Sequence, residues 1–180
     1  MGLKSKAKEL ANTADLPTIP GYSSEQQSES VLYEAAQQIG TPLLIKASAG
    51  GGGKGMVIVR DLNEFLACLA RAKREAMRAF ANDHVILERY FDKAKHIEVQ
   101  IFADQHKNIV HLFERECSLQ RRYQKVIEEA PSPSLDAKTR LKLYQAATKL
   151  ARLVSYVGAG TVEFIFDVTS TSTHKCKFHL

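Results

Sequence analysis

The sequence has few cysteines, no long apolar run and no strong excess of one charge, and each shortage argues against a class of protein. Its three cysteines, Cys68, Cys117 and Cys176, are widely spaced and odd in number. They therefore predict neither a disulfide framework nor a zinc site, and they favour a reducing compartment. No apolar run approaches the roughly 20 residues of a membrane span, and the first residues, "MGLKSKAKE", lack a signal-peptide core. We expect a soluble protein of the cytoplasm or the mitochondrial matrix, with no membrane partner.

The charge pattern argues against a nucleic-acid-binding protein. The 25 Lys and Arg residues exceed the 20 Asp and Glu residues by only five, and both signs are mixed along the chain, as in "RAKREAMR". This mixture is typical of a solvated helix face rather than a basic stripe. Because 44% of the residues are hydrophobic, we expect the chain to fold around a core, as one domain or as a two-lobed piece of something larger.

Hydrophobic periodicity predicts alternating helices and strands without internal repeats. Helices are predicted at residues 4–14, 25–39, 62–80 and 136–154, the last with Ser134 as its N-cap. Strands are predicted at residues 43–47, 56–60, 85–91, 96–102, 109–115 and 160–167, with a return strand at 175–180. Hairpins beside helices indicate an α+β fold with a mostly antiparallel sheet.

Three of these elements have predicted faces. The helix at 62–80 is expected to bury Leu62, Phe65, Leu66, Leu69, Ala76, Met77 and Phe80. The strand at 96–102 alternates, with Ile97, Val99 and Ile101 on one side and His96, Glu98 and Gln100 on the other. On the strand at 160–167, Val162, Phe164 and Phe166 share one face, and Thr161, Glu163, Ile165 and Asp167 share the other.

The stretch "KASAGGGGKGM" at residues 46–56 places four glycines between two predicted strands. Glycines tolerate positive φ and leave backbone N–H groups uncovered, so such a run can fold over an anion. A Walker loop or a Rossmann turn would open a helix, and Lys-Ser or Lys-Thr is absent after the last glycine, so a P-loop is not expected. The run predicts a flexible lid over phosphate oxygens, with a disordered surface hairpin as the alternative.

Charged residues interrupt three apolar strands. Lys46 ends the run Leu43-Leu44-Ile45, and such a cation either pairs with an anion or extends its stem to the surface. Glu88 lies within "VILERYF", and Glu163 within "TVEFIFD". The carboxylate at Glu163 is either an exposed edge residue or a ligand for a hard cation such as Mg²⁺. The polar face of the strand at 96–102 either contacts a ribose or is solvated.

Six blocks of the sequence together resemble a known family. In order and spacing, they resemble the ATP-grasp core of biotin carboxylase, the ATP-dependent component of biotin-dependent acyl-CoA carboxylases, from Met1 to about Asp167. The blocks are "MGLK", "LLIKASAGGGGKGM", "ILERYF", "KHIEVQIFAD", "FERECSLQRRYQKVIEEAPSP" and "YVGAGTVEFIFD". The last block looks particularly like the α-subunits that act on methylcrotonoyl-CoA or related acyl-CoAs.

The resemblance implies a reaction and its participants. ATP, with Mg²⁺ or Mn²⁺, would activate bicarbonate as carboxyphosphate, and the carboxyl group would pass to biotin on a separate carrier domain. A carboxyltransferase subunit would be a further partner, and no nucleic acid is expected.

The resemblance also implies roles for particular residues. Lys4 and Lys46 would contact ATP phosphates, and Gly52 and Gly53 would lie in the lid. The adenine-binding edge would be Glu88, Arg89, Tyr90 and Phe91, and His96 and Gln120 would lie near the ribose. Lys125 would contact bicarbonate, Glu163 would bind the metal, and Tyr123 would stand at a nucleotide contact where the family usually has histidine.

The resemblance implies an ATP-grasp fold with a lid lobe and a partial large lobe. We expect a first segment at 1–41, a lid lobe at 42–113 and a partial large lobe at 114–180. The family's N-terminal domain, second metal carboxylate and biotin-attachment segment have no counterpart in these residues, so we expect an ATP-binding piece that is inactive alone. The alternatives are a non-catalytic nucleotide-binding or interaction module, or another ATP-grasp ligase such as a carbamoyl-phosphate synthetase relative.

Overall fold

The computed structural model describes residues 11, 13, 16, 18–49, 55–121, 124–168 and 178–179. Lys4, Gly52, Gly53 and Tyr123 lie outside these residues, as does most of the helix predicted at residues 4–14. The chain divides into two compact units. One comprises Met1–Ala7 and Ile19–Asp92, and the other comprises Lys8–Thr18 and Lys93–Leu180.

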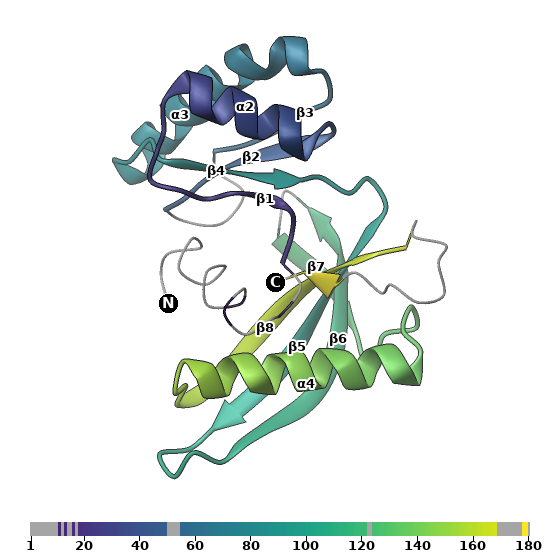
Figure 1. The fold of residues 1–180 in the computed structure, drawn as a ribbon. Helices are drawn as coiled ribbons and strands as arrows, with labels where there is room; N and C mark the ends of the chain where they lie inside the picture. Colours follow the sequence, from purple (N-terminus) through teal and green to yellow (C-terminus); the bar gives the residue numbers. More distant parts are fainter. Residues whose placement is uncertain are drawn as a thin grey trace. The chain divides into compact units, whose positions relative to one another are not determined.

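The first unit is a four-stranded antiparallel sheet with two helices on one face (Figure 1). Its elements are β1 (Gly21–Tyr22), α2 (Glu29–Ile39), β2 (Leu43–Ala47), β3 (Met56–Val59), the 3₁₀ turn η1 (Leu62–Glu64), α3 (Phe65–Phe80) and β4 (Val85–Arg89). The strand order is β1-β4-β2-β3. Because side chains alternate along β2, Leu43 and Ile45 point to the same face and pack in a core with residues of both helices. The hairpin predicted around the glycine run is confirmed, because β2 pairs with β3.

The buried face of α3 differs in part from the predicted one. Phe65, Leu69, Ala72 and Ala76 are buried, at helical spacing. Leu66 and Met77, which were expected inside, are each 49% exposed. The alanines explain this difference, because their small side chains let the helix approach the β2–β3 hairpin closely. A Cβ built on Gly55 would lie 3.6 Å from the Cα of Ala76.

The second unit is a five-stranded antiparallel sheet with one helix across it (Figure 1). Its elements are β5 (Ala94–Ala103), β6 (Ile109–Arg121), β7 (Gln124–Glu129), α4 (Ala137–Leu153), β8 (Gly158–Asp167) and β9 (Phe178–His179), in the order β7-β6-β5-β8-β9. The apolar faces predicted for the strands at 96–102 and 160–167 are confirmed. Ile97, Val99, Ile101, Val162 and Phe164 form a core with Leu143, Ala147 and Leu150 of α4.

The start of α4 corrects a prediction from the sequence. Asp136, not Ser134, is the N-cap, and its carboxylate accepts a hydrogen bond from the backbone N–H of Thr139 at 2.6 Å. The hydroxyl of Ser134 instead donates to Glu116 at 2.8 Å. Both residues are good caps, but Glu116 on β6 provides Ser134 with a tertiary acceptor that the local sequence does not reveal.

The α+β class with antiparallel sheets is confirmed by these two units. The units are not divided where the predicted lobes are. Residues 93–113 were assigned to a lobe at 42–113, but β5 and the first part of β6 form one sheet with β8 and belong to the second unit. Strand β7 was not predicted, because all six of its residues are exposed and it has no apolar face.

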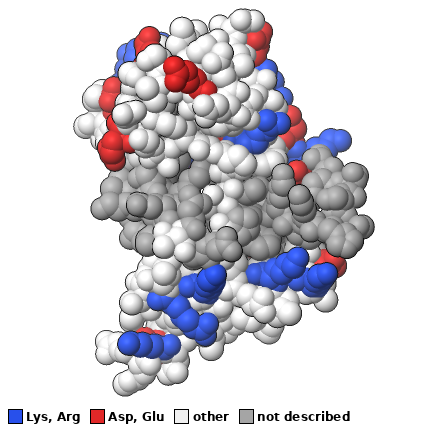
Figure 2. Space-filling view, viewed as in Figure 1, with Lys and Arg blue, Asp and Glu red and all other residues white. Residues whose placement is uncertain are grey.

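The surface charge is uneven along the second unit. α4 carries five basic residues and no acidic one, and Figure 2 shows Lys and Arg side chains with few acidic ones on the face that displays this helix. Among the described residues, no helix is both long enough and apolar enough to cross a membrane.

Candidate functional site

A lysine and a glutamate form a close ion pair on the sheet of the first unit. β2 and β4 are antiparallel, with Leu44 opposite Glu88, so Lys46 and Glu88 are diagonal neighbours on the face away from α2 and α3. Lys46 Nζ donates to Glu88 Oε2 at 2.5 Å, and the two side chains are 19% and 9% exposed. The anionic partner expected for Lys46 is therefore provided by the chain itself. An ammonium group has three donors, so two remain for other acceptors.

The residues after Glu88 are held by the backbone on both sides. The N–H groups of Arg89 and Tyr90 donate to the carbonyls of Pro20 and Pro42, at 2.8 and 3.0 Å. The guanidinium of Arg89 donates to the carbonyl of Ile39, the last residue of α2, at 2.9 Å. These contacts fix the path of the predicted adenine-binding edge, and they give the Arg89 side chain a helix-capping role.

The flanks of the glycine run are ordered by one close approach. The N–H of Ala47 donates to the carbonyl of Gly55 at 3.1 Å. Gly55 has a φ of +66°, and a Cβ there would lie 3.2 Å from the Cβ of Ala47. Both facts favour glycine at this position. Residues 50–54, the run itself, lie outside the described residues.

The second unit brings two carboxylates together on neighbouring strands. Glu98 of β5 stands directly opposite Glu163 of β8, and two like charges in such a pair repel. Lys125 of β7 offsets this repulsion. Its Nζ donates to Glu163 Oε1 at 2.9 Å and also to Glu98 Oε2. Burial works against the ammonium form, but the two carboxylates outweigh burial and raise the pKa of Lys125. Lys125 is therefore a cation at neutral pH and not a general base.

His96 is oriented by Gln120. The Gln120 amide nitrogen lies 2.7 Å from His96 Nδ1 and also donates to the carbonyl of Cys117 at 2.8 Å. Because an amide nitrogen only donates, Nδ1 accepts and the ring proton lies on Nε2, which faces Glu163 at 3.6 Å. His96 and then Lys125 lower the pKa of the Glu163 carboxyl to about 2, against the effect of burial. Glu163 is thus an acceptor throughout the physiological range.

Glu98 and Arg115 belong to this cluster but were not among the predicted site residues. The Glu98 side chain is 3% exposed and forms ion pairs with both Arg115 and Lys125. The sequence did contain a signal for Arg115, the charged run "ERE" at residues 114–116. Because successive side chains of a strand point to opposite faces, a strand with one buried face cannot expose all three charges to solvent.

Within this cluster, Glu163 is the residue best placed to bind a divalent cation. Ligand atoms of His96, Glu98 and Glu163 lie within 4.8 Å of one another, and carboxylate oxygens suit Mg²⁺. The Glu98 carboxylate is already paired with two cations, whereas Glu163 is 55% exposed and open to a further partner. A second group, Glu98, Cys117 and Glu128, fits a metal poorly because Arg115 and Lys125 pair with its carboxylates.

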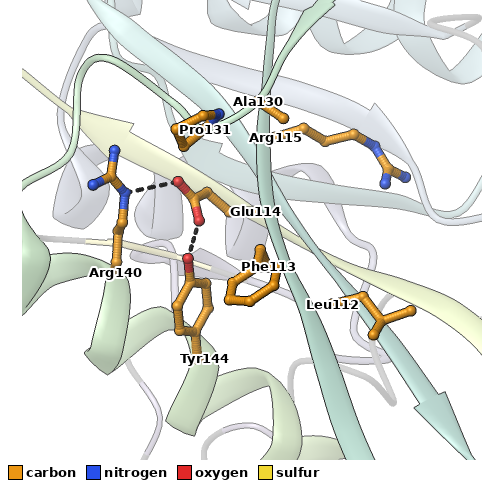
Figure 3. Close-up of a pocket in the computed structure, with 8 residues that line it drawn as sticks. All are labelled: Leu112, Phe113, Glu114, Arg115, Ala130, Pro131, Arg140 and Tyr144. Carbon is orange, nitrogen blue, oxygen red and sulfur yellow. Dashed lines mark hydrogen bonds and ion pairs between the residues drawn. The ribbon is translucent and has the colours of Figure 1, made fainter.

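A separate hollow of about 560 Å³ lies between β6 and α4 (Figure 3). Figure 3 shows Glu114 pointing at Arg140 and Tyr144 of α4, while the Arg115 side chain points away from them. Arg140 Nε donates to Glu114 at 2.8 Å. The hollow is not lined by any site residue predicted from the sequence.

The class of protein follows from a family match that covers most of the chain. Residues 4–174 match the family described as the carbamoyl-phosphate synthase L chain, ATP binding domain, and the chain belongs to this family. Its fold is that of the ATP-grasp domain of biotin carboxylases. Residues 4–174 include Lys46, Glu88, Lys125 and Glu163.

The curated relatives include carboxylase subunits and a biotin carboxylase. The mitochondrial methylcrotonoyl-CoA carboxylase subunit alpha of Rattus norvegicus is 50% identical over 167 residues, which are 93% of this chain and 23% of that protein. The biotin carboxylase of a Nostoc species is 49% identical over 167 residues, 93% of this chain and 37% of that protein.

Solved structures agree. A biotin carboxylase–beta-gamma-ATP complex from Campylobacter jejuni has a TM-score of 0.92 at 40% identity, over 99% of this chain and 39% of that chain. The biotin carboxylase domain of Hydrogenobacter thermophilus 2-oxoglutarate carboxylase, in complex with MgADP, ADP and bicarbonate, has a TM-score of 0.91 at 38% identity, over 99% of this chain and 38% of that chain. The chain thus spans between 23% and 39% of the length of these relatives.

Proposed function

We propose that this chain is the ATP-binding part of a biotin carboxylase, which uses ATP and bicarbonate to carboxylate biotin. The observation that carries the proposal is the likeness, at 40% identity and a TM-score of 0.92, to a biotin carboxylase in complex with beta-gamma-ATP. Two local features support it. The first unit holds a fixed ammonium group beside a glycine-rich hairpin, and the second holds carboxylates that a lysine and a histidine keep ionised.

In the first unit, Lys46 would bind ATP phosphate oxygens, with Lys4, Gly52 and Gly53 as further contacts. The ion pair with Glu88 supports this role, because it holds the ammonium in one place before the nucleotide arrives. Glu88, Arg89, Tyr90 and Phe91 would bind adenine along the edge after β4. Phosphate oxygens would either join Glu88 around the same ammonium or displace it.

In the second unit, Glu163 would bind Mg²⁺, and Lys125 would hold bicarbonate. Bound Mg²⁺ would neutralise phosphate charge. Because its pKa is raised, Lys125 supplies positive charge and does not accept a proton. His96, Gln120 and Tyr123 would contact the nucleotide, and the carboxylate of Glu163 would keep the Nε2 proton of His96 in place.

The partners and the compartment are also part of the proposal. A biotin carrier domain and a carboxyltransferase subunit would complete the reaction. An acyl-CoA carboxylase of the methylcrotonoyl-CoA type is favoured by the relatives, which are carboxylase α-subunits with 48–51% identity. The cytoplasm and the mitochondrial matrix both remain candidate compartments, and we propose a division into lobes that follows the compact units rather than residues 42–113.

Calorimetric titration of ATP with Mg²⁺ tests the proposal. The unaltered chain should bind one ATP. Lys46→Met should weaken binding roughly tenfold to a hundredfold, because a charge-assisted contact is worth roughly 1.5–3 kcal/mol. Lys149→Met, on the exposed side of α4, is the matched control and should bind as the unaltered chain does. Equal losses in the two variants, or none, would contradict the role of Lys46.

A further inference from the structure

We infer that Arg115 is a positioning residue: it shares Glu98 with Lys125, so that the Lys125 ammonium, which donates to both Glu98 and Glu163, can also hold bicarbonate. The inference rests on the proposed bicarbonate role of Lys125 and adds a residue that touches neither bicarbonate nor nucleotide. Its basis is one buried carboxylate shared by two cations. Glu98 Oε1 pairs with Arg115 Nη2, and Glu98 Oε2 pairs with Lys125 Nζ.

Glu98 needs a strong counter-ion because it is almost fully enclosed. Its side chain is 3% exposed, and an unpaired buried carboxylate is costly. Without Arg115, Lys125 would be the one cation left paired with Glu98 among the residues that the structure describes. The ammonium, which now donates to both carboxylates, would then be held more strongly by Glu98 and drawn away from Glu163, to which it donates at 2.9 Å. The positive charge of Lys125 would then be neutralised by the buried Glu98 carboxylate.

Arg115 lies close to two further acceptors besides Glu98, namely Gln100 and Glu128. Its two terminal nitrogens each lie 3.2 Å from the Gln100 side-chain oxygen, and its Nε lies 3.2 Å from Glu128 Oε2. Gln100 is fixed in turn, because its amide nitrogen donates to the carbonyl of Gly160 at 2.8 Å. A guanidinium group can serve three acceptors at once in a planar fork, which an ammonium cannot do with the same geometry.

The neighbours of Arg115 along β6 leave it free for this task. Glu114 pairs with Arg140 on the side of α4 (Figure 3), and Glu116 pairs with Lys95. Neither glutamate therefore depends on Arg115. Figure 3 shows the Arg115 side chain directed away from Glu114 and the α4 residues.

The balance of charges around Lys125 also supports this role of Arg115. Three carboxylates, those of Glu98, Glu128 and Glu163, face the Arg115 and Lys125 cations, with His96 beside Glu163. Removing Arg115 leaves three negative charges against one lysine, an arrangement that repels an incoming anion. At an effective dielectric constant near 20, one charge about 12 Å away changes anion affinity by roughly tenfold, and a nearer charge changes it by more.

The test is a titration of the full chain with bicarbonate, in which the ¹H–¹⁵N shifts of residues 124–129 report binding. Potassium bicarbonate is titrated at constant pH and ionic strength against potassium chloride. Arg115→Met should weaken bicarbonate binding roughly tenfold, and Arg115→Lys should recover part of the loss. The double variant Arg115→Met/Glu98→Gln should bind within about threefold of the unaltered chain, because the buried charge that claims Lys125 is gone.

Four results would overturn the inference. One is an unchanged bicarbonate affinity in Arg115→Met, and another is a double variant as weak as the single one. If Arg115→Met loses its dispersed amide spectrum and therefore does not fold, the Glu98→Gln variant alone tests the inference. It should bind bicarbonate more tightly than the unaltered chain, and weaker binding rejects the inference. Absence of a saturable bicarbonate response in the unaltered chain rejects both the inference and the bicarbonate role of Lys125. ATP binding, titrated separately, would still stand as evidence for the proposed function.

Discussion

Replacing Glu116 by glutamine should destabilise the chain at neutral pH and have little effect at pH 2. Burial alone would raise the pKa of the Glu116 carboxyl, but Lys95, the hydroxyls of Ser134 and Ser132 and then that of Ser118 lower it to about 2. Lys95 Nζ lies 2.8 Å from the carboxylate, and the side chain is 7% exposed. These contacts tie β6 to β5 and to the turn that precedes α4.

The magnitude follows from the shift in pKa. One pKa unit corresponds to about 1.36 kcal/mol, so a fall from 4.5 to about 2 corresponds to about 3 kcal/mol of folding free energy. A lowered pKa stabilises the folded state above the unfolded-state value of 4.5. This stability is lost as the pH falls from about 4.5 to about 2, because the proton then binds the unfolded chain more readily.

Urea unfolding followed by circular dichroism measures this effect. At pH 7, Glu116→Gln should lower the free energy of unfolding by about 3 kcal/mol, and at pH 2 the two proteins should differ little. Glu75→Gln, on the exposed side of α3, is the control and should leave stability unchanged at both pH values. A difference between Glu116→Gln and the unaltered chain that stays constant with pH would show that packing, not the ionised carboxylate, matters at Glu116.

Two further changes test the sites. Glu163→Gln keeps the shape but removes the charge, so more Mg²⁺ should be needed for half-maximal ATP binding, while binding without Mg²⁺ should not change; an unaltered Mg²⁺ requirement would reject the metal role. Because the pKa of the Glu163 carboxyl is about 2, this effect should be constant between pH 6 and 8. Gly55→Ala should cost roughly 1–2 kcal/mol, since its φ is +66° and the new Cβ would lie 3.2 Å from the Cβ of Ala47; a thermal midpoint equal to that of the unaltered chain would contradict this.

Local periodicity was sufficient to predict most of the fold. The apolar faces of β5 and β8 followed from the alternation of apolar and polar residues along these strands, which places Ile97, Val99, Val162 and Phe164 in one core. The face of α3 was harder to predict, because Leu66 is as apolar as Leu69 and only the close fit of Ala76 against the hairpin separates them. β7 has no buried side to leave a pattern.

The candidate site was predictable only where single residues stood out. Lys46 and Glu163 were conspicuous because each is a charge in an apolar strand. Glu88 stood out in the same way, but its pairing with Lys46 was not predictable, since the two lie 42 residues apart. The pairing of Arg115 with Glu98 was not predictable either, because it arises only through strand pairing. Periodicity reports what one element buries, whereas a pair of charges from two elements depends on register between strands, which the sequence does not state.

We propose that Lys46 binds the phosphates of ATP and that Glu163 binds the accompanying Mg²⁺. The most direct measurement is the map of ¹H–¹⁵N shifts when ATP with Mg²⁺ is added to the full chain. We predict saturable shifts at residues 44–47 and 86–91 in the first unit, and saturable shifts at residues 161–165 in the second unit that require Mg²⁺. Shifts confined to residues 112–115 and 130–131, beside the hollow at β6, would contradict the claim, as would the absence of any saturable response.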